Sequence, residues 1–213
     1  MKILITGATG AFGSELAKAF EGHEPILHGR DKSKFPAING QKVVGDLNLQ
    51  SARNELISHC KDIDVFINCA AVFQNCELNE LNDRAICDII DTNLTSPILI
   101  LKEVAEIFKK RGSGTIININ SVAGLKGNSM EAVYCATKYG MKGFMDSIRY
   151  DCIKHGVKVI ELFPGAMREG MAKYREGSEN FTDPKELAEF VTHIVNKKTV
   201  FTTGIEIHRA IYE

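Results

Sequence analysis

Short runs of β-forming residues alternate with longer segments of helical periodicity from one end of the chain to the other. The short runs are bounded by turn-forming residues and predict strands. We expect seven of them, at Lys2–Thr6, Pro25–Gly29, Gln41–Gly45, Asp64–Cys69, Thr115–Asn120, Val157–Phe163 and Thr199–Ile207.

The longer segments have apolar stripes at helical spacing and predict helices between these strands. They lie at Ser14–Glu21, Ser51–Cys60, a long segment reaching Lys110, Glu131–His155 and Pro184–Asn196. Strands that alternate with helices form a parallel sheet covered on both faces, and right-handed crossovers leave few other topologies. The pattern therefore predicts an α/β fold: a Rossmann-like, doubly wound parallel seven-stranded sheet in a single domain over residues 1–213.

Composition restricts the function classes. Twenty-six basic and 27 acidic residues give a net charge of -1, so we expect neither nucleic acid nor a membrane surface as a partner. The six cysteines form no Cys-x-x-Cys pair and are expected to be reduced thiols. The chain begins without an apolar run long enough for a signal peptide, so we expect a cytoplasmic protein.

A glycine-rich turn, Thr6-Gly7-Ala8-Thr9-Gly10-Ala11-Phe12-Gly13, joins the first predicted strand to the first helix. Glycines at such a turn let the backbone approach a pyrophosphate, and the free N–H groups of the helix start attract an anion. The spacing alone also fits a plain turn. Its place directly after the first strand favours dinucleotide binding.

Arg30 ends the second strand, where the partner of the adenosine ribose is expected. A carboxylate there would bind the 2′-hydroxyl of NAD, whereas arginine suits the 2′-phosphate of NADP. Arg30 therefore indicates NADP, with NAD as the weaker alternative because Asp31 is adjacent and could turn inward. A surface charge with no ligand is the remaining interpretation of Arg30.

Three polar residues stand at places where a nucleotide or a proton path could lie. Asp46 and Asn68 close the third and fourth strands, although a helix N-cap and a turn would also explain them. Asn93 lies inside a helical pattern shortly before Pro97, which predicts a distorted turn that is either structural or holds a water molecule.

Tyr134 and Lys138 stand four residues apart, thirteen positions after Ser121. On a helix the two side chains share one face, so the ammonium group can act on the phenol. A nearby cation makes tyrosine a stronger acid, and a serine hydroxyl can hold a carbonyl oxygen while it is protonated. This combination suits reduction of a carbonyl by a hydride donor.

Other chemistries find less support. The six histidines show no metal-ligand spacing, so no metal site is predicted. Ser121 has no preceding glycine and lacks the strained turn of a hydrolase nucleophile. The charged segment Gly165–Thr182 follows the sixth strand and is interpreted equally well as a solvated surface or as a substrate lid.

Together these positions resemble the short-chain dehydrogenase/reductase family over nearly the whole chain. The resemblance rests on motifs in the family's order: Thr6-Gly7 with Gly10 and Gly13, Asp46, Asn68-Cys69-Ala70-Ala71, Asn93, Ser121, Tyr134 with Lys138, and Pro164-Gly165. Three features depart from it: Ala11 replaces a glycine, Glu169 stands where a cofactor-contacting threonine is usual, and the C-terminal tail is short.

The resemblance implies a role for each motif. Tyr134 would be the general acid/base, and Lys138 would bind the nicotinamide ribose and lower the tyrosine pKa. Ser121 would orient the carbonyl, and Asn93 would anchor a water molecule in a proton relay. Asp46 would contact the adenine. The full cofactor-binding set comprises Thr6, Gly7, Thr9, Gly10, Ala11, Phe12, Gly13, Arg30, Asp46, Leu47, Asn68, Cys69, Ala70, Tyr134, Lys138, Pro164 and Gly165.

The leading hypothesis is an NADP-dependent oxidoreductase that interconverts a ketone or aldehyde and an alcohol. A non-catalytic dinucleotide-binding regulator of the same fold is the alternative, and the Ser, Tyr and Lys set argues against it. An epimerase or dehydratase that uses bound NAD transiently is disfavoured by Arg30 and by the short chain. The expected partners are a small carbonyl or alcohol substrate and further copies of the chain, in a homo-dimer or homo-tetramer.

Overall fold

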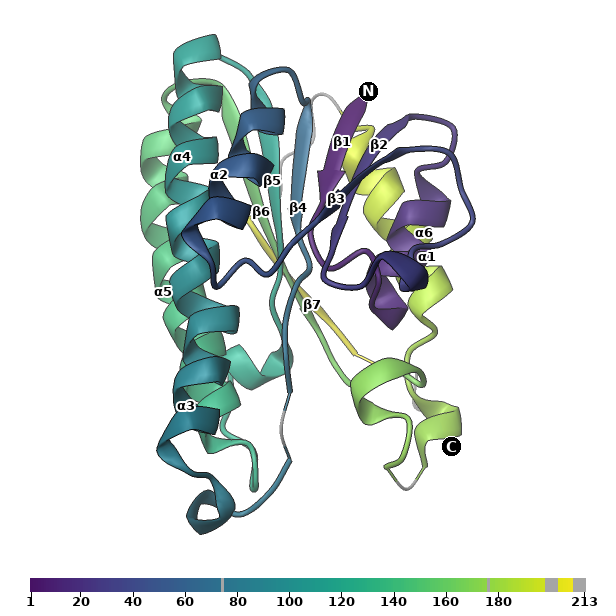
Figure 1. Ribbon diagram of the computed structural model, residues 1–213, viewed down its shortest axis with the longest axis vertical. Coiled ribbons are helices and arrows are strands. Elements are labelled where there is room, and N and C mark those ends of the chain that lie inside the picture. Colours follow the sequence, from purple (N-terminus) through teal and green to yellow (C-terminus); the bar gives the residue numbers. More distant parts are fainter. Residues whose placement is uncertain (74, 176, 198–202, 209–213) are drawn as a thin grey trace.

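In a computed structural model, one seven-stranded sheet runs through the protein (Figure 1). The structure describes residues 1–73, 75–175, 177–197 and 203–208. All strand pairs are parallel, and their order is β3-β2-β1-β4-β5-β6-β7. The strands are β1 (Lys2–Ile5), β2 (Glu24–Gly29), β3 (Gln41–Val44), β4 (Val65–Asn68), β5 (Gly114–Ile119), β6 (Val157–Pro164) and β7 (Gly204–Ile207). The predicted fold class is confirmed.

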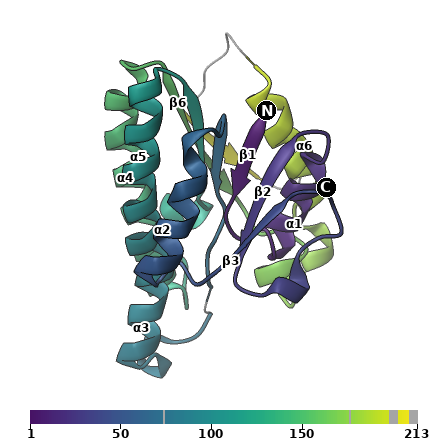
Figure 2. The same ribbon diagram turned by 45° about the horizontal axis from the view of Figure 1, so that its top comes forward.

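Helices cover both faces of the sheet. The α-helices are α1 (Ala11–Ala19), α2 (Gln50–Ser58), α3 (Asp83–Ile90), α4 (Ser96–Arg111), α5 (Ala132–Ile153) and α6 (Pro184–Val195). Short 3₁₀ turns are η1 (Lys32–Lys34), η2 (His59–Lys61), η3 (Leu78–Glu80), η5 (Val122–Gly124), η6 (Gly170–Ala172) and η7 (Ser178–Asn180). In Figures 1 and 2, α2, α4 and α5 lie on one side of the sheet, and α1 and α6 lie on the other.

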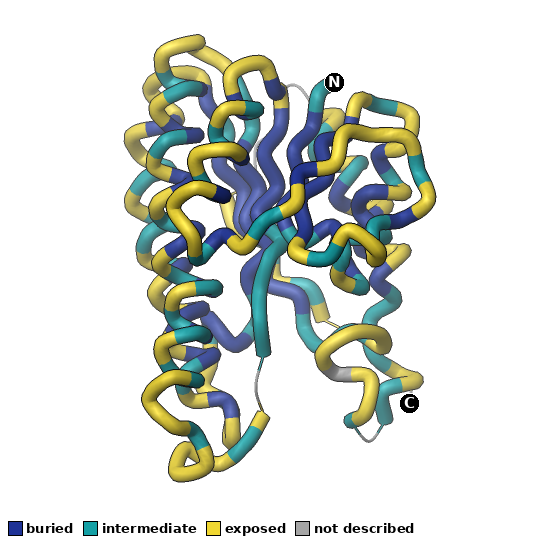
Figure 3. Tube along the Cα trace, in the orientation of Figure 1, coloured by how far each residue is buried: buried dark blue, intermediate teal, exposed yellow. Residues whose placement is uncertain are grey.

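Two apolar cores result from this layering. Alternate residues of the strands point to opposite faces of the sheet. On one face they pack against α2, α4 and α5 around Leu4 and Phe66, and on the other they pack against α1 and α6 around Ile5 and Ile67. These strand residues have no exposed surface, as the dark centre of Figure 3 shows. Burial on both faces explains why the strands read as continuous apolar runs.

The long helical segment of the sequence is two helices joined by a π-helical turn. Helix α3 continues into η4 (Asp91–Thr95), and α4 follows with Pro97 in its first turn. The distortion predicted at Asn93 is therefore present. None of the described helices is long and apolar enough to cross a bilayer.

The order of the strands creates a crevice. The chain winds outward from β1 to β3, then returns to β4 on the other side of β1 and winds in the opposite direction. Ligands of doubly wound sheets bind at the carboxyl ends of the strands beside this reversal.

Element boundaries differ slightly from the sequence prediction: α1 begins at Ala11, directly after Gly10, and β7 begins at Gly204. Residues 199–202 of the predicted last strand lie outside the described residues.

Candidate active site

A cavity of about 460 Å³ opens at the carboxyl ends of the strands. Most of the predicted site residues line it: Gly7, Thr9, Gly10, Ala11, Phe12, Gly13, Arg30, Asp46, Leu47, Cys69, Ala70, Ser121, Tyr134, Lys138, Pro164 and Gly165. Thr6, Asn68 and Asn93 lie behind its wall and support it. The cavity therefore brings the glycine-rich turn and the Ser, Tyr and Lys set into one space.

The glycine-rich turn is shaped by close backbone contacts. Gly7 has a φ of 71°, and a Cβ there would lie 2.7 Å from the Cα of Ala70. A Cβ on Gly13 would lie 2.1 Å from the carbonyl oxygen of Gly7. Behind the turn, the Thr6 hydroxyl accepts hydrogen bonds from the N–H groups of Cys69 and Ala70, at 3.1 and 3.2 Å. Only glycine fits where helix, turn and the loop after β4 meet.

The arginine end of the cavity has a clear charge arrangement. Asp31 caps η1 and accepts hydrogen bonds from the N–H and hydroxyl of Ser33, at 3.0 and 2.7 Å. These bonds to Ser33 hold the pKa of Asp31 below its ordinary value, and Lys34 lies 3.4 Å away. Among the described residues, no acidic side chain forms an ion pair with Arg30. Arg30, Asp31 and Lys34 all line this end of the cavity, and the carboxylate of Asp31 is held by Ser33 and Lys34.

Asp46 has a local role that differs from a helix cap. Its carboxylate accepts a hydrogen bond from the N–H of Asn48 at 3.0 Å, while Leu49 is the residue at the N-cap of α2. The N-cap interpretation of Asp46 is therefore wrong. The turn that Asp46 stabilises leaves both Asp46 and Leu47 on the cavity wall.

Asn93 uses its side chain to hold the loop that follows β4. Its amide oxygen accepts from the N–H of Val72 and its amide nitrogen donates to the carbonyl of Val72, both at 2.8 Å. The π-helical turn places this buried side chain against the loop. A role as the anchor of a water relay stays a prediction, whereas the structural interpretation has direct support.

Tyr134 lies in the first turn of α5 and Lys138 in the second, and Ser121 follows β5. Ser121 lies close enough to Tyr134 to act on its pKa as a hydrogen-bond partner, and the Ser121 hydroxyl accepts from the N–H of Ala123 at 3.1 Å. The ammonium group of Lys138 donates to the carbonyl of Ile119 at 3.2 Å and lies 5.5 Å from the centre of the Tyr134 ring. The three side chains thus meet at one end of the cavity.

Burial, rather than the lysine charge, controls the acidity of both groups. Burial raises the pKa of Tyr134 to about 12, although the Ser121 hydrogen bond acts in the other direction. Burial also lowers the pKa of Lys138 to about 8, although electrostatic interactions with Cys69 and Glu161 act to raise it. The net pKa shift of Tyr134 is thus opposite to the direction expected for a phenol beside a cation, because desolvation is its largest cause. A lowering of the tyrosine pKa by Lys138 stays a prediction.

Phe73, Glu131 and Arg175 complete the wall around Tyr134. The Phe73 ring packs edge-on against Tyr134, with ring centres 4.9 Å apart. The guanidinium group of Arg175 lies 5.1 Å above the Phe73 ring and forms an ion pair with Glu131, which Asn128 also holds at 3.0 Å. Glu131 and Arg175 are 44 positions apart, and no sequence pattern links them.

The segment Gly165–Thr182 forms part of the cavity wall. Met167, Glu169, Gly170, Met171 and Arg175 line the cavity, and Met167 pairs with Thr182 in a short β-bridge. The segment has features of both interpretations, because part of it lines the cavity while Tyr174 is 88% exposed, and a role as substrate lid stays a prediction. Glu169, which replaces the usual threonine, lies at the cavity.

Cys69 lines the cavity, but no cysteine among the described residues forms a disulfide bond or belongs to a metal-binding cluster. All six cysteines are free, and burial raises the pKa of Cys69 to about 12, which keeps its thiol protonated. Over the described ranges, no group of three histidine, cysteine or acidic residues is placed to hold a metal ion.

Comparison with known proteins identifies the family. A family model described as short chain dehydrogenase matches residues 1–180. The chain belongs to the short-chain dehydrogenase family. Its members are oxidoreductases that act on CH–OH and C=O groups, so the protein is an enzyme of this class.

Curated relatives cover nearly the whole chain. The 3-oxoacyl-acyl-carrier-protein reductases of Rickettsia typhi and Rickettsia conorii are 26% and 28% identical, covering 96% of this chain and 93% of each relative. A short-chain dehydrogenase/reductase structure from Vibrio parahaemolyticus is 26% identical, with a TM-score of 0.84 over 98% of this chain and all of that one. The NADPH-bound actinorhodin polyketide ketoreductase is 22% identical with a TM-score of 0.84, covers 98% and 95% of the two chains, and shares the fold.

Proposed function

We propose that the protein is an NADP-dependent reductase that interconverts a ketone or aldehyde and an alcohol, with the proton supplied by Tyr134. One observation carries this proposal: Ser121, Tyr134 and Lys138 meet in the same cavity as the glycine-rich turn and Arg30. When bound, the nicotinamide supplies a hydride. The remaining chemistry, which is to orient the carbonyl and to deliver a proton, falls to the chain's own residues.

The cavity residues fit a dinucleotide with an additional phosphate. The close backbone packing at Gly7 and Gly13 holds the turn against the start of α1, where free N–H groups suit a pyrophosphate. Arg30 suits the 2′-phosphate because it forms no ion pair among the described residues, whereas the carboxylate of Asp31 is held by Ser33 and Lys34. NADP-bound and NADPH-bound structures among the family's fold neighbours support the same choice, and NAD is the weaker alternative.

Proton delivery follows from the state of Tyr134. With a pKa of about 12, the phenol is protonated at neutral pH and can donate to a carbonyl oxygen as negative charge develops there. The Ser121 hydroxyl can donate a second hydrogen bond to the same oxygen. A Lys138 side chain with a pKa of about 8 would hold the nicotinamide ribose and favour the phenolate left after transfer.

The composition of the site favours catalysis over cofactor binding alone. A regulator that binds a dinucleotide needs the glycine-rich turn but gains nothing from a buried tyrosine beside a buried lysine, which both carry a desolvation cost. The non-catalytic alternative is therefore disfavoured.

For the assembly we propose a homo-dimer or homo-tetramer, and for the location the cytoplasm. Exposed apolar side chains along α4 and α5 support the oligomer, namely Leu99, Tyr139, Tyr150 and Ile153.

The test is a variant that removes only the proposed proton donor. NADPH is incubated with ketones, aldehydes and 3-oxoacyl thioesters, and cofactor absorbance is followed. Tyr134→Phe should lower kcat by about a hundredfold to ten-thousandfold, the usual worth of a positioned general acid, and leave the NADPH dissociation constant nearly unchanged. Tyr139→Phe is the matched control, because this tyrosine lies on the same helix and is 46% exposed. Near-normal turnover of Tyr134→Phe would show that the proton comes from another group.

A further inference from the structure

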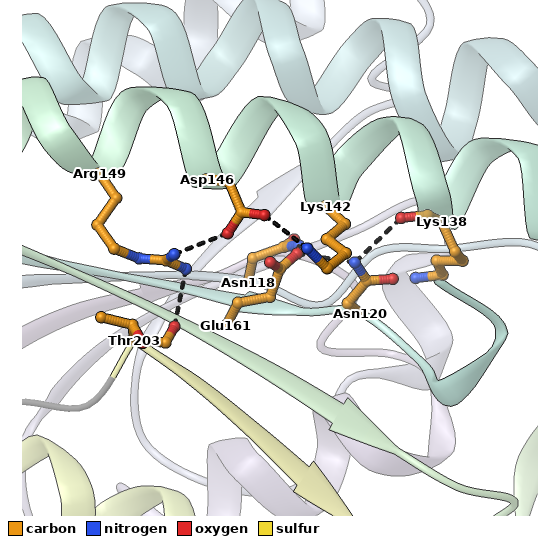
Figure 4. A network of polar contacts seen from close by, with 8 residues as sticks. All are labelled: Asn118, Asn120, Lys138, Lys142, Asp146, Arg149, Glu161 and Thr203. Carbon is orange, nitrogen blue, oxygen red and sulfur yellow. Dashed lines mark hydrogen bonds and ion pairs between the residues drawn. The ribbon is translucent and has the colours of Figure 1, made fainter. Parts of the chain in front are cut away.

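Glu161 is a buried acidic residue for which the proposed mechanism has no use. It lies in β6 between two core residues, Ile160 and Leu162, and has no exposed surface. Its Oε1 accepts two hydrogen bonds, from Nδ2 of Asn118 at 2.9 Å and from Nδ2 of Asn120 at 2.7 Å (Figure 4). A carboxyl group in an apolar core is costly unless its hydrogen bonds compensate for lost water, so this contact needs an explanation.

Glu161 terminates a row of buried hydrogen bonds that crosses the sheet. Asn68, Asn118 and Glu161 are register partners on β4, β5 and β6. Nδ2 of Asn68 donates to Oδ1 of Asn118 at 2.8 Å, and the Thr6 hydroxyl donates to Oδ1 of Asn68 at 3.2 Å. The row therefore connects the base of the glycine-rich turn with β6.

The other end of the row reaches the catalytic helix. Nδ2 of Asn120 donates both to Glu161 and to the backbone carbonyl of Lys138, the latter at 3.1 Å. The Lys138 ammonium group returns to the same strand end and donates to the carbonyl of Ile119. Backbone and side chain of Lys138 are thus both anchored to Ile119-Asn120, and Glu161 is the acceptor that fixes the Asn120 amide.

The charged residues above Glu161 do not act as its partners. Three charged residues of α5 face Glu161, namely Lys142, Asp146 and Arg149. They form ion pairs with one another instead: Asp146 pairs with Lys142 at 2.6 Å and with Arg149 at 2.7 Å (Figure 4). None of the described residues forms a hydrogen bond with Oε2 of Glu161. Burial raises the pKa of Glu161, so its carboxyl holds a proton to higher pH than an exposed glutamate does. Glu161 therefore contacts its neighbours as a hydrogen-bond acceptor and forms no ion pair among the described residues.

We propose that Glu161 is a positioning residue of the active site: its Oε1 orients the Asn120 amide, and this amide holds the turn of α5 that carries Lys138. The inference rests on the proposed role of Lys138 in binding the cofactor. Glu161 does not line the cavity, so it acts on the cofactor through the side chains that it holds, and the proposed route runs through Asn120 and Lys138.

Cofactor binding tests the proposal without any substrate. The dissociation constant of NADPH is measured by fluorescence titration of the full chain. Glu161→Leu removes the acceptor and should weaken NADPH binding by about tenfold, as expected for loss of a buried hydrogen bond. Glu161→Gln keeps an acceptor oxygen and the shape, and should restore binding to within about twofold. Asp146→Asn, the matched control, disturbs the ion pairs on the same helix face and should leave binding unchanged.

A double-mutant cycle then separates positioning from general destabilisation. If Glu161 acts through Lys138, adding Glu161→Leu to Lys138→Ala should weaken binding no further. The proposal would be overturned if the double variant lost affinity for NADPH by the product of the two single losses. It would also be overturned if Glu161→Gln bound NADPH as weakly as Glu161→Leu. Should Glu161→Leu fail to fold by circular dichroism, Asn120→Ser breaks the same link from its other end and replaces it in the cycle. If the cycle shows coupling between Glu161 and Lys138 but the protein reduces no carbonyl compound, only the proposed function is refuted.

Discussion

Lys138 should destabilise the protein while it serves the active site. Burial lowers the pKa of this side chain from 10.5 to about 8. The unfolded chain therefore binds a proton at a higher pH than the folded protein does. As pH falls from about 10.5 to about 8, the unfolded state gains a proton that the folded state does not, and the free energy of unfolding decreases.

The size of this effect follows from the two pKa values. Each tenfold change in proton affinity corresponds to about 1.36 kcal/mol, so the interval from 10.5 to about 8 corresponds to about 3 kcal/mol. Lys138→Met keeps the length of the side chain and removes the charge. Relative to the natural chain, this variant should therefore gain about 3 kcal/mol between about pH 10.5 and about pH 8, or about 6 to 12 °C in Tm.

The measurement is urea unfolding of both proteins, followed by circular dichroism across this pH range without cofactor. The difference between the two proteins is the informative quantity, because other lysines titrate equally in both. Lys142→Met is the matched control: this side chain is 37% exposed, and its hydrogen bond with Asp146 raises its pKa. It should show no gain as pH falls. A stability difference between Lys138→Met and the natural chain that stays constant with pH would refute the reasoning.

Three further results are expected. Arg30→Ala should remove most of a preference for NADPH over NADH of about tenfold to a hundredfold, and equal dissociation constants in the unmutated protein would exclude the phosphate contact. Gly13→Ala should lower stability by about 1 to 3 kcal/mol and weaken NADPH binding, whereas Gly22→Ala, whose Cβ would meet nothing within 4 Å, should be nearly neutral in thermal unfolding. Light scattering at micromolar concentration should give a multiple of the 23.5 kDa chain mass, and a monomer mass would contradict the proposed assembly.

The sequence was sufficient for the parts of the molecule that depend on local pattern. The order of strands and helices follows from apolar runs such as Ile3-Leu4-Ile5, which can be buried only between two helix layers. The place of the cavity follows from Gly7 and Gly13, because a glycine-rich turn after the first strand has few other uses. The spacing of Tyr134 and Lys138 likewise placed both side chains on one helix face.

Other features depend on contacts between distant positions and were not predictable. Asp31 and Arg30 are adjacent in the sequence, and only the structure shows that both line the cavity while the Asp31 carboxylate is held by Ser33. The net pKa shift of Tyr134 is opposite to the expected direction because spacing does not reveal desolvation. Glu161 shows no sign of its role in the sequence, since its partners come from the neighbouring strand.

The π-helical turn η4 makes the number of residues in this segment matter as much as their identity. A π-helical turn holds one residue more than an α-helical turn, so α3 and α4 differ in rotational phase by about 100° from a continuous helix. Deletion of one residue from Asp91–Thr95 would restore a regular helix, yet it would swing Asn93 away from Val72 and release the loop that carries Phe73. A chain that is one residue shorter here would keep its helix and lose the wall of its active site.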